Sequence, residues 1–146
     1  MLWQVYSRKG LVYVPTVART EAGYYMDIDP VEVVPAKDTP SLERAIKKAI
    51  SNGNPIVPTP SRAAFPEPVV LKYAGMKSWR AFENGASNWT IVQKDGIYEI
   101  KPGRKRLDKG WEDDPAKVES LPRGVRLDEV AQRVAILIQE RADQSE

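Results

Sequence analysis

Two carboxylates stand two residues apart at Asp27 and Asp29, and Glu32 follows closely. Alternate side chains of a β-strand point to the same face, so Asp27 and Asp29 would project together. Oxygen ligands of this kind can hold Mg²⁺, and paired carboxylates can serve general acid–base chemistry. Two acids beside a proline turn are also typical of a solvated strand end. The metal or acid–base interpretation needs further convergent groups, and the neighbouring sequence supplies none.

A second chemical feature is the basic segment 101–109, whose members are Lys101, Arg104, Lys105, Arg106 and Lys109. Cations near aromatic residues can hold phosphates while the rings stack on bases, so this segment is a candidate nucleic-acid-binding site. The acidic residues 112–114 follow at once and cancel much of the positive field, which favours an exposed loop of mixed charge. Such charge blocks also offer a surface to a protein partner, and we expect Trp111 between them to be partly exposed.

The residue types that are missing exclude several classes of chemistry. The 146 residues include no Cys and no His. Disulfides, thiol nucleophiles, Cys/His zinc sites and histidine general bases are therefore excluded. The glycines form neither a phosphate-binding loop nor a dinucleotide-binding motif. We expect a protein that is not an enzyme and needs no cofactor.

Length and composition indicate one globular domain spanning residues 1–146. The hydrophobic fraction of 42% and charged fraction of 29% are ordinary for such domains. The 22 basic and 20 acidic residues nearly balance, which argues for neither a nucleic-acid binder nor an acidic mimic. The sequence has no apolar run long enough to cross a membrane and no export signal, so we expect a cytoplasmic location.

Short runs of β-branched, aromatic and alternating residues predict several strands. These cover residues 3–7, 11–17, 24–28, 31–34, 69–73, 89–93 and 97–100. Gly10 and the pair Asp95-Gly96 predict hairpin turns between neighbouring runs. Pro30 cannot donate to a strand ladder, so the Asp29-Pro30 break should lie at a sheet edge or in a connection. From 101 to 124 the pattern dissolves, and we expect an exposed loop.

Apolar residues at helical spacing predict two long helices, one capped by Thr39 and ended by Gly53, the other over 127–142. A shorter helix is expected over 78–84. The proline-dense segment 55–68 favours extended backbone, either functional or packed onto the core through its apolar residues. The order of elements predicts an α+β domain with a mainly antiparallel sheet and two principal helices packed on one face.

Two segments resemble a known class of bacterial protein, namely YVPTVARTEAGYYMDIDPVEVVP (13–35) and PVVLKYAGMKSWRAFENGASNWTI (68–91). They look like immunity proteins of contact-dependent growth inhibition, a polymorphic toxin system. The resemblance implies a protein that binds its cognate toxin domain, often a nuclease, and blocks the active site or substrate surface. Partners of basic nucleases are often acidic, and the pI near 8.8 departs from that expectation.

Local acidic patches would then supply the partner-binding surface. The candidate partner-binding residues are Asp27, Asp29, Glu32, Trp111, Glu112, Asp113 and Asp114. Two other functions stay open at this point. One is a nucleic-acid-binding accessory protein that uses the basic segment 101–109, and the other is a small metal-dependent enzyme that uses Asp27 and Asp29.

Overall fold

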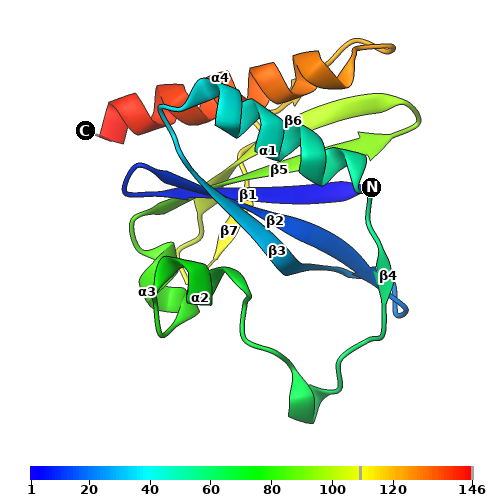
Figure 1. Cartoon of the computed structure of the whole chain (residues 1–146), viewed down its shortest axis with the longest axis vertical. Helices are drawn as coiled ribbons and strands as arrows, with labels where there is room; N and C mark the ends of the chain where they lie inside the picture. Colours follow the sequence, from blue (N-terminus) through cyan, green and yellow to red (C-terminus); the bar gives the residue numbers. More distant parts are fainter. Residues whose placement is uncertain (109, 146) are drawn as a thin grey trace.

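The structure is a computed structural model that describes residues 1–108 and 110–145 (Figure 1). Its strands are β1 Leu2–Arg8, β2 Leu11–Thr20, β3 Tyr25–Pro35, β4 Ile56–Val57, β5 Ala86–Lys94, β6 Ile97–Lys105, β7 Trp111–Asp113 and β8 Glu119–Ser120. Its helices are α1 Thr39–Ser51, the single 3-10 turn η1 Arg62–Ala64, α2 Val70–Ala74, α3 Trp79–Glu83 and α4 Leu127–Ser145. The sheet order is β3-β2-β1-β5-β6-β7, with β4 paired to β2 and β8 to β6. Only the β2–β4 pairing is parallel among these, so the predicted α+β class with a mainly antiparallel sheet is confirmed.

The two long helices lie side by side over one face of the sheet, as predicted (Figure 1). Their buried stripes meet sheet residues such as Trp3 and Trp89, which are 1% and 2% exposed. The stripes comprise Leu42, Ala45, Ile46, Ala49 and Ile50 of α1 and Val130, Ala131, Val134, Ala135 and Ile138 of α4. Burial of these side chains is the main stabilising term of this layer.

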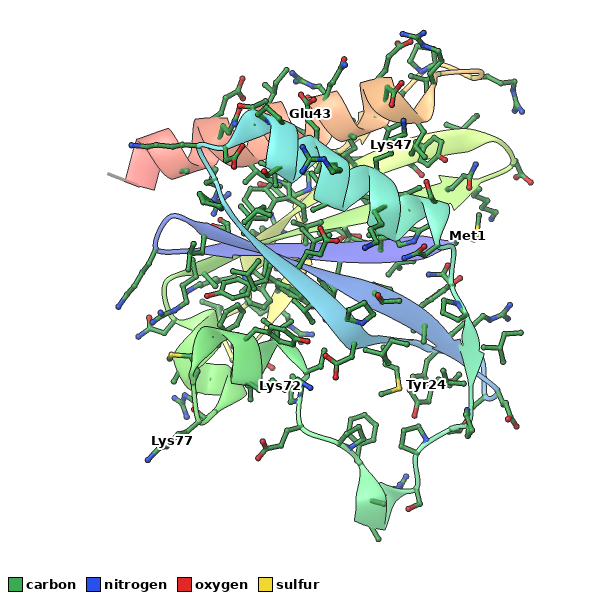
Figure 2. All side chains as sticks on the ribbon, viewed as in Figure 1. Met1, Tyr24, Glu43, Lys47, Lys72 and Lys77 are labelled. Carbon is green, nitrogen blue, oxygen red and sulfur yellow. The ribbon has the colours of Figure 1, made fainter. Side chains whose placement is uncertain are left out.

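The start of α1 differs from the prediction by one residue. Asp38, rather than Thr39, is the N-cap, and its carboxylate accepts hydrogen bonds from the backbone N–H and the hydroxyl of Ser41. A carboxylate at this position also faces the positive end of the helix dipole. Gly53 adopts the predicted left-handed conformation, with φ of 66°. Lys47 lies on the exposed side of α1 (Figure 2) and forms an ion pair with Asp128 of α4.

The opposite face of the sheet carries the two short helices and an aromatic cluster. Tyr6, Tyr13 and Phe82 are buried there, and Trp79 and Trp111 pack against them. The predicted strand over 69–73 is wrong, because this segment forms helix α2 on that face. A run of five apolar and polar residues fits the period of a helix as well as that of a strand. Packing of its buried side chains against the sheet favours the helix.

Both predicted tight hairpins are present. Lys9 and Gly10 have φ of 50° and 79°, and Asp95 and Gly96 have φ of 54° and 76°. Two consecutive positive φ values match the twist of antiparallel strands. The Asp29-Pro30 bond is cis and lies where the pairing of β3 with β2 shifts register. Since β3 is an edge strand, the predicted position of this break is confirmed.

The expectation of a loop over 101–124 is wrong in part. Strand β6 continues to Lys105, β7 pairs with it, and β8 pairs with its first half. These strands are rich in charged residues, so they lack the alternating apolar pattern that signals a strand. Within the described residues, no helix is long and apolar enough to cross a membrane.

Candidate functional site

The proline-rich segment 58–69, here called the strap, crosses the sheet face that carries the short helices. The first end of the strap is held, because β4 pairs with the end of β2 and Thr59 Oγ1 accepts a hydrogen bond of 2.8 Å from Ala22 N. Its other end leads into α2, whose Val70 is 0% exposed. Its middle contributes nothing to the core. Of the apolar residues of segment 55–68, Ile56 and Phe65 are 74% and 60% exposed and Val57 is half-buried. Of the two alternatives for this segment, packing onto the core through these residues is therefore largely not observed.

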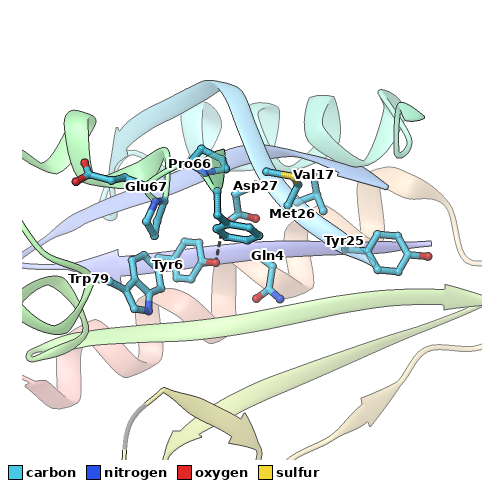
Figure 3. A pocket seen from close by; sticks show the side chains of 11 residues that line it. Gln4, Tyr6, Val17, Tyr25, Met26, Asp27, Pro66, Glu67 and Trp79 are labelled. Atoms are coloured by element: carbon cyan, nitrogen blue, oxygen red, sulfur yellow. Dashed lines mark hydrogen bonds between the residues drawn. The ribbon is translucent and has the colours of Figure 1, made fainter. Parts of the chain in front are cut away.

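A cavity of about 230 Å³ lies between the strap and the sheet (Figure 3). Gln4 and Tyr6 of β1 form its floor, Met26 and Asp27 of β3 form one side, and Trp79 closes one end. The strap residues 65–68 form the remaining wall. A second, more open groove continues from it along β3 toward α2 and shares Asp27 and the strap wall. The strap therefore creates a concave surface on this face of the sheet.

Tyr6 and Asp27 form the polar centre of this cavity. The Tyr6 hydroxyl donates a hydrogen bond of 2.6 Å to Asp27 Oδ2. The Tyr6 ring is itself fixed by edge-on contact with Trp79, at 5.5 Å between centroids, and with Phe82, at 6.0 Å. Figure 3 shows Tyr6 and Asp27 turned toward each other, with Trp79 beside the tyrosine ring. Aromatic packing thus holds the donor that orients the carboxylate.

Burial perturbs the acid–base properties of both groups. It raises the pKa of Asp27 to about 6, and the hydrogen bond from Tyr6 opposes that rise. Burial also raises the pKa of Tyr6, and the nearby Asp27 charge raises it further. Asp27 is half-buried and has no cation against it among the described residues, so its carboxyl is costly to ionise and its environment resembles those of many functional acids.

Gln4 is oriented from the other side of the cavity. Its Oε1 accepts hydrogen bonds from Asn88 Nδ2 at 2.8 Å and from Thr90 Oγ1 at 3.3 Å. Both donors lie on β5, where Thr90 is directly opposite Gln4 and Asn88 is opposite Tyr6. With its oxygen engaged in this way, Gln4 keeps its amide hydrogens for a group in the cavity.

Asp29 lies at the outer groove and makes different contacts from Asp27. Its carboxylate forms an ion pair with Lys72 of α2 and accepts a hydrogen bond from the Tyr73 hydroxyl. These two donors lower the pKa of Asp29. Figure 2 shows Lys72 where the strap joins α2. The two carboxylates therefore do open on one side of the sheet, but one is exposed and ion-paired while the other is sheltered.

Glu32 does not join this pair. It lies beyond the register shift and forms an ion pair of 3.2 Å with Lys48 of α1, on the opposite face of the sheet. The predicted set of Asp27, Asp29 and Glu32 is thus divided between two faces. Among the described side chains, those of residues 1–108 and 110–142, no group of three or more metal-binding residues comes together.

The basic segment and the acidic residues that follow it pair with each other. Arg104 of β6 meets Glu112 of β7 at 3.2 Å, directly across the strand pair. Lys101 lies 3.8 Å from Asp113 in the same hairpin. Arg106 pairs with Asp108 at 3.3 Å.

This pairing neutralises much of the proposed nucleic-acid patch. Lys105 lines an open hollow beside α3, and Lys109 lies outside the described residues. Asp114 accepts a hydrogen bond from Ala116 N in the turn that follows β7.

Trp111 is half-buried, as expected for a partly exposed tryptophan. Its ring lies 5.8 Å from Trp79 and 6.0 Å from Tyr6, so it extends the aromatic cluster below the cavity. Its neighbours Glu112 and Asp113 are exposed. The β6–β7 hairpin therefore supports the cavity indirectly through Trp111, while its charged residues face solvent.

Sequence reasoning did not single out Gln4, Tyr6, Phe65, Glu67 or Trp79 as site residues. Tyr6 and Asp27 are 21 positions apart in the sequence. They meet because the sheet order places β1 and β3 on either side of β2, and the long Tyr6 side chain spans that distance. No local pattern encodes that contact. The proline density of the strap was the one available signal, since a long irregular segment inside a domain is often functional.

No protein-family model matches the sequence, and no curated protein matches it either. Two solved structures share its fold. A protein of unknown function from Neisseria meningitidis is 15% identical, with a TM-score of 0.63 over 94% of this chain and 94% of that chain. A chain of a CdiA-CT/CdiI toxin and immunity complex from Yersinia pseudotuberculosis is also 15% identical, with a TM-score of 0.61 over 94% of this chain and 95% of that chain. At this identity, the similarity shows a common fold over nearly the whole chain.

Proposed function

We propose that this chain is an immunity protein that binds a cognate bacterial toxin domain and neutralises it by protein–protein contact. The observation that carries the proposal is the similarity to a chain of a toxin and immunity complex over 94% of the sequence. The resemblance of segments 13–35 and 68–91 to immunity proteins of contact-dependent growth inhibition points the same way.

Of the two roles in such a complex, inhibition by binding fits this chain better than toxic catalysis. The sequence has no His and no Cys, so it lacks the commonest general base and the commonest thiol nucleophile. We infer that the chain acts without catalysis, in the cytoplasm of the cell that it protects. Its perturbed carboxyl, Asp27, serves recognition in this proposal.

The strap face is the surface that we assign to the toxin. Exposed aromatic and apolar side chains gather around a concave site there, including Phe65 at 60% exposure and Tyr73 at 39%. Aromatic anchors and pockets are typical of the residues that dominate binding energy at interfaces.

The direct test is to express this chain with and without the C-terminal domain encoded immediately upstream of it in its host. The expected result is growth arrest by that domain alone, rescue by this chain, and a stoichiometric complex on co-purification. Growth arrest by this chain alone would contradict the proposal. Rescue failure together with no complex would contradict it as well.

Two sets of alanine variants locate the surface. One replaces Asp27, Asp29 and Glu32, and the other replaces Glu112, Asp113 and Asp114. A buried charged hot spot costs at least about 1.4 kcal/mol, or tenfold in affinity, when it is removed. We expect such a loss for the first set, measured by calorimetry with the purified toxin domain. Unchanged affinity in both sets would exclude both acidic clusters from the interface.

A further inference from the structure

The cavity beneath the strap has the size of a single side chain. Its volume is about 230 Å³, whereas sites for drug-sized ligands and cofactors usually run from about 300 to 1,000 Å³. Protein interfaces commonly place one large anchor side chain in a pocket of this kind. The size therefore favours a residue of a protein partner over a cofactor.

The charge of the lining selects a cation. Asp27 and Glu67 both line the cavity, and none of the described residues around it carries a positive charge. The nearest lysine on the groove side, Lys72, is already paired with Asp29. A guest with a positive charge would therefore meet the Asp27 carboxylate beside Tyr6, while Glu67 lies on the strap wall with its carboxylate turned away from Asp27 (Figure 3).

Asp27 retains an oxygen for such a guest. Its Oδ2 accepts the hydrogen bond from Tyr6, while Oδ1 has no hydrogen-bond partner among the described residues. In the described part of the chain, the one fully enclosed side-chain nitrogen or oxygen without a partner is Arg8 Nε, on another part of the surface. Oδ1 therefore stays accessible from the cavity, and a carboxylate oxygen there can accept charge-assisted hydrogen bonds.

The aromatic walls favour a planar cation. Tyr6, Phe65 and Trp79 all line the cavity. The guanidinium group stacks on aromatic faces and presents its donors in one plane toward carboxylates, which a lysine ammonium does not do. Arginine is also the charged residue most enriched at interface hot spots.

We propose that the cavity beneath the strap receives an arginine side chain of the toxin partner, held by Asp27 and Glu67 and stacked against the aromatic wall. This step rests on the proposed function for the identity of the partner. The chemistry of the cavity can be tested without the toxin, so failure of one proposal can be told from failure of the other.

The pH dependence follows from the titratable and charged groups around the cavity. Tyr6 from β1 faces Asp27, Tyr25 from β3 and Glu67 from the strap line the same cavity, and Asp29 and Lys72 lie in the adjoining groove. Burial raises the pKa of Asp27 to about 6, so the carboxyl is largely protonated at pH 5 and ionised at pH 8. A guanidinium guest prefers the ionised form, so its affinity should rise with pH across this interval.

The test titrates the purified chain with N-acetyl-arginine amide and, separately, with N-acetyl-citrulline amide, a neutral isostere. The NMR signal of the Trp79 indole N–H is followed at pH 8 and pH 5. We expect saturable shifts with the arginine probe at pH 8, with a dissociation constant on the order of millimolar for one isolated group. The citrulline probe should bind at least about tenfold more weakly at pH 8. The arginine probe should likewise bind at least about tenfold more weakly at pH 5 than at pH 8.

Variants assign the effect to the cavity. Asp27→Asn keeps an acceptor for the Tyr6 hydroxyl, and Glu67→Gln changes only an exposed strap residue. Each should weaken the arginine probe at least about threefold, whereas Asp114→Asn, on the turn after β7, should leave it unchanged. Equal response to arginine and citrulline, or full binding by both cavity variants, would overturn the proposal. Equal loss in Asp114→Asn would overturn it too, because the effect would then reflect overall charge.

Discussion

The Tyr6 hydroxyl reaches from β1 to the carboxylate of Asp27 on β3, two strands away in the sheet, with a donor–acceptor distance of 2.6 Å. Tyr6 is 6% exposed and lies within the aromatic cluster. A carboxyl in this position is sheltered from water and has one hydrogen-bond donor but no cation. Its ionisation is therefore coupled to the stability of the fold and to the occupancy of the cavity.

The first prediction concerns stability and pH. The pKa of Asp27 is about 6 in the folded protein, compared with an ordinary value of 3.8. The folded state therefore binds the Asp27 proton more tightly than the unfolded state does. Protonation of Asp27 stabilises the fold, and this stabilisation is fully present below pH 3.8 and is lost as pH rises through 6. The shift of about two units corresponds to about 3 kcal/mol.

Urea denaturation of the wild type and of Asp27→Asn from pH 4 to pH 8 measures this contribution. The variant should gain stability relative to the wild type as pH rises, by up to about 3 kcal/mol at pH 8. Asp29, Glu119 and Asp128 have lowered pKa values, so their protonation destabilises the fold in acid. This loss is common to the wild type and the variant, so the difference in stability between the two proteins reports on Asp27. Tyr6→Phe removes the bond that lowers the Asp27 pKa, so its transition should move to higher pH. Parallel curves for wild type and Asp27→Asn would contradict the assignment.

The second prediction separates binding from folding on the strap. Phe65 is 60% exposed, so Phe65→Ser should change the free energy of unfolding by no more than about 0.5 kcal/mol. Its affinity for the toxin domain should fall at least about tenfold, since exposed aromatics beside a pocket act as anchors.

Leu107→Ser is the matched control for Phe65→Ser, because Leu107 is fully exposed in the β6–β7 connection, away from the cavity. Binding assays with both variants should show a loss for Phe65→Ser alone. The opposite pattern would place the interface on the β6–β7 hairpin.

The third prediction contrasts two glycines. A Cβ at Gly103 would lie 3.0 Å from Asn88 Oδ1 and 3.2 Å from Trp111 Cβ, so Gly103→Ala should cost about 1–3 kcal/mol through overpacking. A Cβ at Gly10 meets nothing within 4 Å, but φ is +79°, so Gly10→Ala costs about 1 kcal/mol through backbone strain.

Asparagine at both sites distinguishes the two causes. Asn tolerates the left-handed conformation, so Gly10→Asn should be more stable than Gly10→Ala in thermal or urea unfolding. Gly103→Asn adds volume at a closed site and should be less stable than Gly103→Ala. The same rank order at both glycines would refute the distinction.

The fourth prediction concerns the contact that ties the end of the sheet to α4. Arg133 donates two hydrogen bonds to Glu119 of β8, at 2.8 and 2.6 Å, and lowers the pKa of Glu119. Both side chains are about one-third exposed, so solvent screening limits the gain. A double-mutant cycle with Glu119→Gln and Arg133→Gln should give a coupling of about 0.5–1 kcal/mol that declines with salt.

The exposed pair Arg126–Glu129 provides the comparison for that cycle. It is a single contact of 3.0 Å with side-chain exposures of 76% and 50%. Its coupling should be no more than about 0.5 kcal/mol. Equal coupling in the two pairs would show that the two-bond geometry of Arg133 adds nothing.

Local signals were sufficient to predict much of this fold. Helix α4 has a continuous apolar stripe, and the turn at Asp95-Gly96 has the strongest short-range hairpin signature, so neither required tertiary information. Helix α2 was missed because five residues cannot separate a helical from a strand period. Strands β7 and β8 were missed because pairing with β6 defines them, and apart from Trp111 their own residues are polar or charged.

The candidate site was less accessible to sequence reasoning than the fold. The spacing of Asp27 and Asp29 correctly suggested a common side of the sheet, yet it gave no indication that Tyr6 shelters one of them. Glu32 was grouped with them because it is near in sequence, but the register shift at Asp29-Pro30 and the contact with Lys48 set it apart. Contacts between distant strands depend on topology, which residue spacing alone does not encode.

The strap has a consequence for how this protein can diverge. Every residue from 61 to 68 is exposed, while backbone pairing and Thr59 fix the first end of the segment and the buried start of α2 fixes the other. Substitutions along the strap therefore cost little stability, because they do not disturb the core. The main constraint on them is binding by the segment. Under the proposed function, substitutions in the strap can change which toxin is bound while the scaffold stays the same, so two relatives with one fold can come to bind different toxins.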